Sequence, residues 1–173
     1  NGPTVNIYPS PRDTVCGNPT GNATFTATAV NPGGTPSYQW YKNGNIIAGA
    51  TSSTYAATGI QTGDVYHVKL LPGTGAACNT AVNSNQITMT VMPYITPTVN
   101  ITVSPDSTAW SGLMLTFTAT ATNAGNNPKY QWKVNGTNAG TNSSTYSYTP
   151  ANGDVVTVVL TSNATCATGS PAT

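Results

Sequence analysis

Two short stretches with nearly the same sequence constrain this chain more than any other feature. Residues 38–44 read Tyr-Gln-Trp-Tyr-Lys-Asn-Gly, and residues 130–136 read Tyr-Gln-Trp-Lys-Val-Asn-Gly. A strand pattern that carries one tryptophan and runs into Asn-Gly predicts a core β-strand followed by a tight type I′ hairpin. Its recurrence predicts that the chain consists of two copies of one small β-domain.

The repeat extends over most of the chain. The offset between the copies is 94 at Pro3 and Pro97, 92 at the two Tyr-Gln-Trp motifs, and 88 at Cys78 and Cys166. The offset shrinks steadily, which indicates shorter loops in the second copy. We therefore expect one repeat over residues 1–93 and a second over residues 94–173, joined by a short, proline-containing and stiff connector.

Residues 23–30 alternate between apolar side chains and threonines, which is the period-two signature of a half-buried antiparallel strand. About seven such short strands per copy, with turn signals every 8–12 residues or so, predict an all-β chain of two tandem immunoglobulin-like β-sandwiches. The aromatic residues that we expect in the two cores are Phe25, Trp40, Phe117 and Trp132.

The second copy has no counterpart of residues 84–91 within this chain. A sandwich without its last strand has an unpaired edge and part of its core exposed. Two interpretations stay open. The sequence is a section of a longer repeat array, or another chain donates the missing strand, as in donor-strand assembly.

Charged residues make up 5% of the chain, against about 25% in an average soluble protein, and the net charge is +1. This composition provides no basic surface of the kind that binds nucleic acid or an anionic membrane. No run of about 18 apolar residues is present, so we expect no membrane insertion.

The titratable residues are too few and too dispersed for catalysis. The single histidine, His67, is expected to be solvated, and a triad, a carboxylate pair or a zinc cluster needs several such groups in one place. We therefore expect no catalytic residue, no metal and no cofactor. Asp64 and Asp154, each preceded by glycine, are expected to cap the turn before a strand through side-chain-to-backbone hydrogen bonds.

The three cysteines indicate an oxidising compartment. Cys16 precedes the second strand and Cys78 follows the strand at residues 65–71, so a disulfide between them is predicted, with a buried free thiol as the alternative. In the second copy Trp110 occupies the position of Cys16, which leaves Cys166 alone. Cys166 is then either inert in a covered site or available for an intermolecular bond.

Four motifs carry a resemblance to a known class of proteins. They are Val15-Cys16-Gly17, residues 38–44, Gly63-Asp64-Val65 and Ser84-Asn85-Gln86-Ile87. They resemble the immunoglobulin-like and PKD-like repeats of giant surface proteins in Bacteroidota, including the gliding-motility adhesins exported by the type IX secretion system. The resemblance implies a Cys16–Cys78 bridge as the usual one of the repeat, and O-glycosylation at Thr14 and Ser107.

Architecture and resemblance together predict a non-catalytic extracellular structural module, part of a cell-surface filament or a long repetitive adhesin. Assembly by strand complementation is the mode that follows if another chain donates the missing strand. Its expected partners are neighbouring copies of itself or adjacent repeats of a longer chain. The alternative is a carbohydrate-binding accessory domain of a secreted polysaccharide-active enzyme, with surface glycans as partners. That role needs exposed aromatic side chains, and Tyr41, on the face opposite Trp40, is the candidate.

Overall fold

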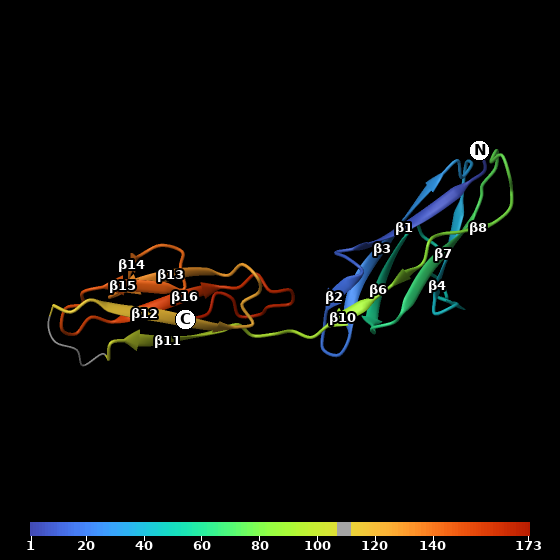
Figure 1. The fold of residues 1–173 in the computed structure, drawn as a ribbon. Coiled ribbons are helices and arrows are strands. Elements are labelled where there is room, and N and C mark those ends of the chain that lie inside the picture. Colours follow the sequence, from blue (N-terminus) through green and yellow to red (C-terminus); the bar gives the residue numbers. More distant parts are fainter. Residues whose placement is uncertain (107–111) are drawn as a thin grey trace. The chain divides into compact units, whose positions relative to one another are not determined.

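The computed structural model describes residues 1–106 and 112–173, in which every regular element is a β-strand (Figure 1). The chain divides into two compact units, Asn1–Pro93 (unit 1) and Tyr94–Thr173 (unit 2).

Unit 1 consists of two facing sheets and a short parallel pair. One sheet has the order β1 (Thr4–Ser10), β3 (Gly21–Val30), β6 (Thr54–Ile60). The other has the order β5 (Asn45–Ile46), β4 (Ser37–Lys42), β7 (Val65–Leu71), β8 (Val82–Asn83), and β9 (Ile87–Thr88) also pairs with β7. The parallel pair is β2 (Thr14–Cys16) with β10 (Thr90–Met92).

The described residues of unit 2 repeat this arrangement with fewer strands. Its first sheet has the order β11 (Thr98–Ser104), β12 (Leu115–Thr122), β15 (Thr145–Tyr148), and its second β14 (Thr137–Ala139), β13 (Lys129–Val134), β16 (Val156–Thr161). These orders match those of β1-β3-β6 and β5-β4-β7. The predicted fold class, two tandem immunoglobulin-like sandwiches, is confirmed.

The core of unit 1 follows from the alternation predicted for β3. Ala23, Phe25 and Ala27 are buried, while the threonines between them are exposed. Trp40 is fully buried, and its indole Nε1 donates a hydrogen bond of 2.8 Å to the carbonyl of Ser52. The buried indole therefore keeps a hydrogen-bond partner, as a core tryptophan requires.

Both Asn-Gly hairpins have the predicted geometry. Asn43 and Gly44 have φ values of 52° and 79°, and Asn135 and Gly136 have 51° and 80°. Positive φ at both central residues defines the type I′ turn, which matches the twist of the flanking strands. Each turn joins the tryptophan strand to its neighbour, β4 to β5 and β13 to β14.

The structure differs from the sequence prediction at the shortest strands. β2 and β8 were not predicted, because two or three residues give no detectable alternation. The alternation of Ile87, Met89 and Val91 predicts one strand over residues 86–91, and the structure divides it into β9 and β10. The segment changes partner at Met89. The amide of Met89 still bonds to the carbonyl of Asp64, next to β7, whereas the amide of Thr90 bonds to the carbonyl of Asp13, next to β2.

The predicted disulfide between Cys16 and Cys78 is wrong. Cys78 is a free, exposed cysteine, whereas Cys16 and Cys166 are both disulfide-bonded. The prediction that Cys166 is an unpaired thiol, inert or available for an intermolecular bond, is therefore also wrong. The prediction that a disulfide is present holds, with different cysteines.

The direction of the strands explains this error. Gly21, at the start of β3, pairs with Ile60, which shortly precedes β7, so β3 and β7 start at the same end of the sandwich. The strand β2, which ends with Cys16, lies at that end (Figure 1). Cys78 comes after β7 in the sequence, beyond its far end. The seven residues of β7 span roughly 20 Å, well beyond the roughly 7 Å that a disulfide allows between Cα atoms.

Phe117 is less buried than its predicted core role implies. Trp132 is fully buried, but Phe117 is only partly buried, 6.4 Å from Trp132 between ring centroids. Its counterpart Phe25 stacks on Tyr66 at 4.5 Å. In unit 2 a valine, Val156, occupies the position of Tyr66 and provides no ring to cover Phe117.

Candidate functional site: the open edge of unit 2

Unit 1 shows how this sandwich closes its last edge. Residues 82–92 run along β7 and then along β2. Met89 is fully buried, and Ile87 and Val91 pack against the core. The last segment therefore completes both a sheet and the hydrophobic core.

Asn85 and Met89 also satisfy backbone groups on β1 and in the turn before β7. The side chain of Asn85 accepts a hydrogen bond of 2.7 Å from the amide of Ile7 and donates one of 3.2 Å to its carbonyl. Met89 accepts a bond from the amide of Gly63 and donates one to the carbonyl of Asp64, each 2.8 Å long. The segment thus serves four backbone groups outside its own strand.

In unit 2 the corresponding edge is largely open. In the described part of the chain, the outer side of β16 pairs with Ala172, which exchanges two backbone hydrogen bonds with Leu160. This bridge reproduces the register between Val82 and Leu70 in unit 1. From there toward the start of β16, no described residue pairs with its outer side.

Side chains at this edge are correspondingly exposed. Ile101 is 36% exposed, whereas its counterpart Ile7 is fully buried. Val155 is 61% exposed, while its counterpart Val65 is only partly exposed. Ile101 pairs with Ala119, whose amide bonds to the carbonyl of Ser144 on the other side of β12. The backbone groups of Ile101 therefore point away from β12, as expected for a non-hydrogen-bonded pair.

A carboxylate links the two turns at the end of β4 and the start of β7. Asp64 is 6% exposed, and its Oδ2 accepts hydrogen bonds from the amide of Gln61 at 2.8 Å and from Lys42 Nζ at 2.7 Å. Its Oδ1 accepts one from Asn43 Nδ2 at 2.9 Å, and Asn43 Oδ1 in turn accepts one from the amide of Val65. The capping role predicted for Asp64 is confirmed, with Asn43 and Lys42 as additional partners.

Unit 2 builds the same link without the cation. Asp154 accepts hydrogen bonds from the amide of Ala151 at 2.8 Å and from Asn135 Nδ2 at 2.7 Å. Asn135 Oδ1 accepts one from the amide of Val155. Tyr148 adds a hydroxyl at 3.3 Å. The link between turns is therefore a property of the repeat.

The electrostatics of the two carboxylates differ. Burial raises the pKa of Asp64, but the hydrogen bonds from Gln61, Lys42 and Asn43 outweigh it, and the net pKa is below the ordinary value. The hydrogen bond from Asn135 is the main cause that lowers the pKa of Asp154. Both carboxylates are therefore ionised at neutral pH and are engaged within the fold.

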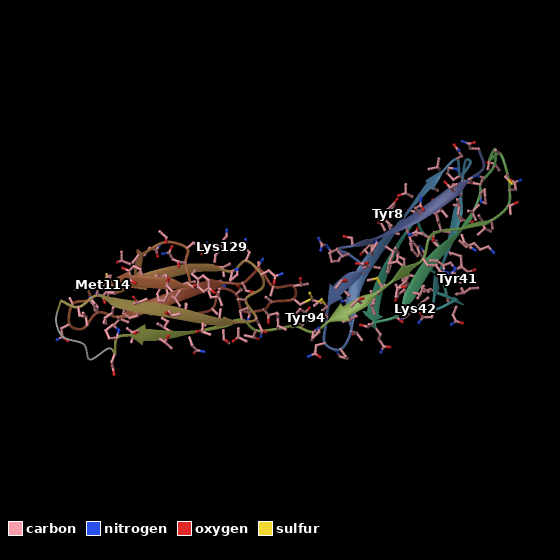
Figure 2. The ribbon with its side chains drawn as sticks, in the orientation of Figure 1. Tyr8, Tyr41, Lys42, Tyr94, Met114 and Lys129 are labelled. Carbon is pink, nitrogen blue, oxygen red and sulfur yellow. The ribbon has the colours of Figure 1, made fainter. Side chains whose placement is uncertain are left out.

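Tyr41 and His67 form a stacked pair on the face of the β4–β7 sheet away from Trp40. Their ring centroids are 4.7 Å apart with an interplanar angle of 8°. Figure 2 shows Tyr41 next to Lys42 on β4. Partial burial lowers the pKa of His67, so this residue is not fully solvated as predicted. The carbohydrate-binding role of Tyr41 stays a prediction, with one ring face already covered by His67.

Thr14 lies in β2, with its hydroxyl 3.5 Å from Oδ1 of Asp13. Ser107 and Trp110 lie outside the described residues. Where the structure is described, no group of three or more metal-ligating side chains is found, and no helix has the length and apolar character needed to cross a membrane.

The role of the glutamine in the Tyr-Gln-Trp motif was missed by the sequence analysis. Gln39 Nε2 donates a hydrogen bond to the carbonyl of Ile47 at 2.8 Å, and Gln131 Nε2 donates one to that of Ala139 at 3.1 Å. The recurrence of the glutamine between tyrosine and tryptophan was the available signal. In each unit this glutamine side chain forms a hydrogen bond between the tryptophan strand and the segment after the Asn-Gly turn.

The fold defines a tandem pair of immunoglobulin-like sandwiches. A scan against models of protein families found no match, and a search of curated proteins also found none. Among solved structures, the chain is similar to the human OSCAR ligand-binding domain, with 12% identity and a TM-score of 0.37. That similarity covers 94% of this chain and 92% of the other.

Proposed function

We propose that this chain is a non-catalytic extracellular structural module, a repeating part of a cell-surface filament or of a long repetitive adhesin. Its partners are neighbouring copies of itself or adjacent repeats of a longer chain.

The observation that carries the proposal is that one complete side-chain framework is built twice. In each unit a buried tryptophan donates to a backbone carbonyl, Trp40 to Ser52 and Trp132 to Ser143. In each unit an Asn-Asp pair connects two turns. Repetition of a self-contained framework is how extended structural proteins are built.

The surface supports the same role. The outer face of β3 exposes Thr24, Thr26 and Thr28, and the outer face of β12 exposes Thr118 and Thr120. With 5% charged residues in the whole chain, contacts through such faces depend on hydroxyl groups and shape. Screening by salt acts on charges, so these contacts are insensitive to ionic strength.

The cysteines support an extracellular location. Cys16 and Cys166 are disulfide-bonded, and disulfides persist in oxidising compartments such as the cell exterior. Cys78 remains free and exposed. Its Sγ lies 3.4 Å from Oγ1 of Thr80, and this hydrogen bond lowers the pKa of the Cys78 thiol, which favours the reactive thiolate.

Cys78 therefore provides a test of the location. We expect a membrane-impermeant maleimide added to intact producing cells to modify the chain at Cys78, as measured by peptide mass spectrometry. A Cys78→Ser variant should remain unmodified, because the other two cysteines are oxidised. Modification that occurs after lysis but not on intact cells would contradict an extracellular module.

A further inference from the structure

Three Asn-Gly dipeptides lie in turns of this chain, and they begin at Asn43, Asn135 and Asn152. Such a dipeptide is chemically fragile, because glycine has no side chain to shield its backbone nitrogen from the asparagine before it. That nitrogen attacks Cγ of the asparagine and expels ammonia, which leaves a cyclic imide. Water then opens the imide to aspartate or isoaspartate, so the net reaction consumes water and releases ammonia.

We propose that Asn152 deamidates spontaneously in the folded chain, whereas the asparagines of the two type I′ hairpins are protected by the aspartates that bind them. Modification of Asn152 removes the protection of Asn135, so the two sites of unit 2 react in a fixed order. This inference goes beyond the proposed function and does not depend on it.

The side chains of both hairpin asparagines are held at both ends of the carboxamide. Asn43 Nδ2 donates a hydrogen bond of 2.9 Å to Oδ1 of Asp64, and Asn43 Oδ1 accepts one of 2.8 Å from the amide of Val65. The corresponding two bonds of Asn135 are 2.7 and 2.9 Å long. Both bonds must break before Cγ turns toward the glycine nitrogen, and a carboxylate oxygen then loses its donor. This cost slows the reaction in both hairpins.

Among the described residues, no group holds the side chain of Asn152. Asn152 is exposed, and its carboxamide forms no hydrogen bond with residues 1–106 or 112–173. The amide nitrogen of Gly153 donates to no backbone carbonyl of these residues. Where a Cβ of Gly153 would stand, no atom outside its chain neighbours lies within 4 Å. The nitrogen that attacks and the carbon that is attacked are therefore both accessible.

The product alters the turn that positions Asp154. In this turn the amide of Asp154 donates to the carbonyl of Ala151 at 3.2 Å, and Oδ2 of Asp154 accepts from the amide of Ala151 at 2.8 Å. Isoaspartate adds an atom to the backbone between positions 152 and 153, and either product adds a negative charge close to Asp154. Asp154 is thereby displaced from Asn135, whose carboxamide becomes able to react.

The order of the reactions is tested by incubating the full chain at mildly alkaline pH, below its melting temperature. Peptide mass spectrometry follows each site, and cleavage after Lys133 leaves Asn135 and Asn152 in one peptide. We expect Asn152 to react roughly tenfold faster than Asn43, which must first give up a hydrogen bond to a charged acceptor. Deamidated Asn135 should appear after a lag, in molecules already modified at Asn152. In concentrated urea the three sites should react at similar rates.

Unit 1 supplies the matched control, because it has Thr62 at the position equivalent to Asn152. The Asn152→Thr variant should not react at this position, and its Asn135 should react as slowly as Asn43. Conversely, Asp64→Ala should speed deamidation of Asn43 roughly tenfold and leave Asn152 unchanged. Equal rates at the three sites of the folded chain, modification of Asn135 before Asn152, or an unchanged rate at Asn43 in Asp64→Ala would overturn the proposal.

Discussion

Replacement of Trp40 with alanine is expected to destabilise unit 1 by about 3–5 kcal/mol, the largest effect of any single substitution considered for this chain. Trp40 is fully buried, lies 6.0 Å from Phe25 and 5.9 Å from Tyr55 between ring centroids, and donates a hydrogen bond to Ser52. Alanine would leave a cavity at the centre of the core and an unpaired carbonyl. Because a domain is typically stable by about 5–15 kcal/mol, unit 1 would become marginal.

Urea denaturation followed through the amide resonances of each unit measures this effect separately for the two sandwiches. The matched control is Tyr41→Ala on the same strand, which removes a partly exposed ring and its stacking on His67. We expect that control to cost about 1 kcal/mol. Equal losses for the two variants would mean that Trp40 is not the centre of the core.

Replacement of Asp64 with alanine is expected to lower the stability of unit 1 by about 2–3 kcal/mol and its melting temperature by about 10–20 °C. The side chain is buried, and its removal leaves Lys42 Nζ, Asn43 Nδ2 and the amide of Gln61 without their acceptor. Calorimetry of the full chain measures the change. The matched control, Asp154→Ala, should have a smaller effect on unit 2, since Asp154 is more exposed and pairs with no cation among the described residues.

The same carboxylate gives unit 1 a predictable pH dependence. The pKa of Asp64 is lower in the folded chain than its ordinary value of 3.8. The ionised form is therefore favoured by folding, and its stabilisation is fully present above pH 4 and is lost as the pH falls through the folded pKa. The Asp64→Ala variant should lose less stability than the native chain on acidification below pH 4. An unchanged acid dependence would contradict this assignment.

The strands that contain the Tyr-Gln-Trp motif could be predicted because local and repeated signals agree there. Asn-Gly specifies the type I′ turn, the tryptophan specifies the buried face, and the second copy supports both. The alternation of alanine and threonine in β3 likewise fixed which face is buried. The strand predicted at residues 65–71 is β7, with the same bounds.

The cysteine pairing could not be predicted from positions next to strands. Adjacency to a strand does not say at which end of the sandwich a residue lies, and β3 and β7 start at the same end. Only the order of the strands in space separates Cys16 from Cys78. The partial burial of Phe117 was also hidden, since it depends on the replacement of Tyr66 by Val156 across the core.

The sequence predicts that the second copy lacks its last strand within this chain. It does not predict which side chains and backbone groups line the open edge. The hydrogen bonds from Asn85 to Ile7 join residues that are far apart in the sequence. No periodicity connects an asparagine side chain with the backbone of the first strand. The structure of unit 1 was needed to identify the groups that unit 2 exposes.

Electron microscopy of the native material, without denaturant and at low and high salt, tests the central claim most directly. The account predicts elongated assemblies in which the repeating subunit is a pair of β-sandwiches. They should persist at both salt concentrations, because the chain has few charges for salt to screen. Dispersed compact particles, with no elongated assembly at either salt concentration, would contradict a structural module of a filament or long adhesin.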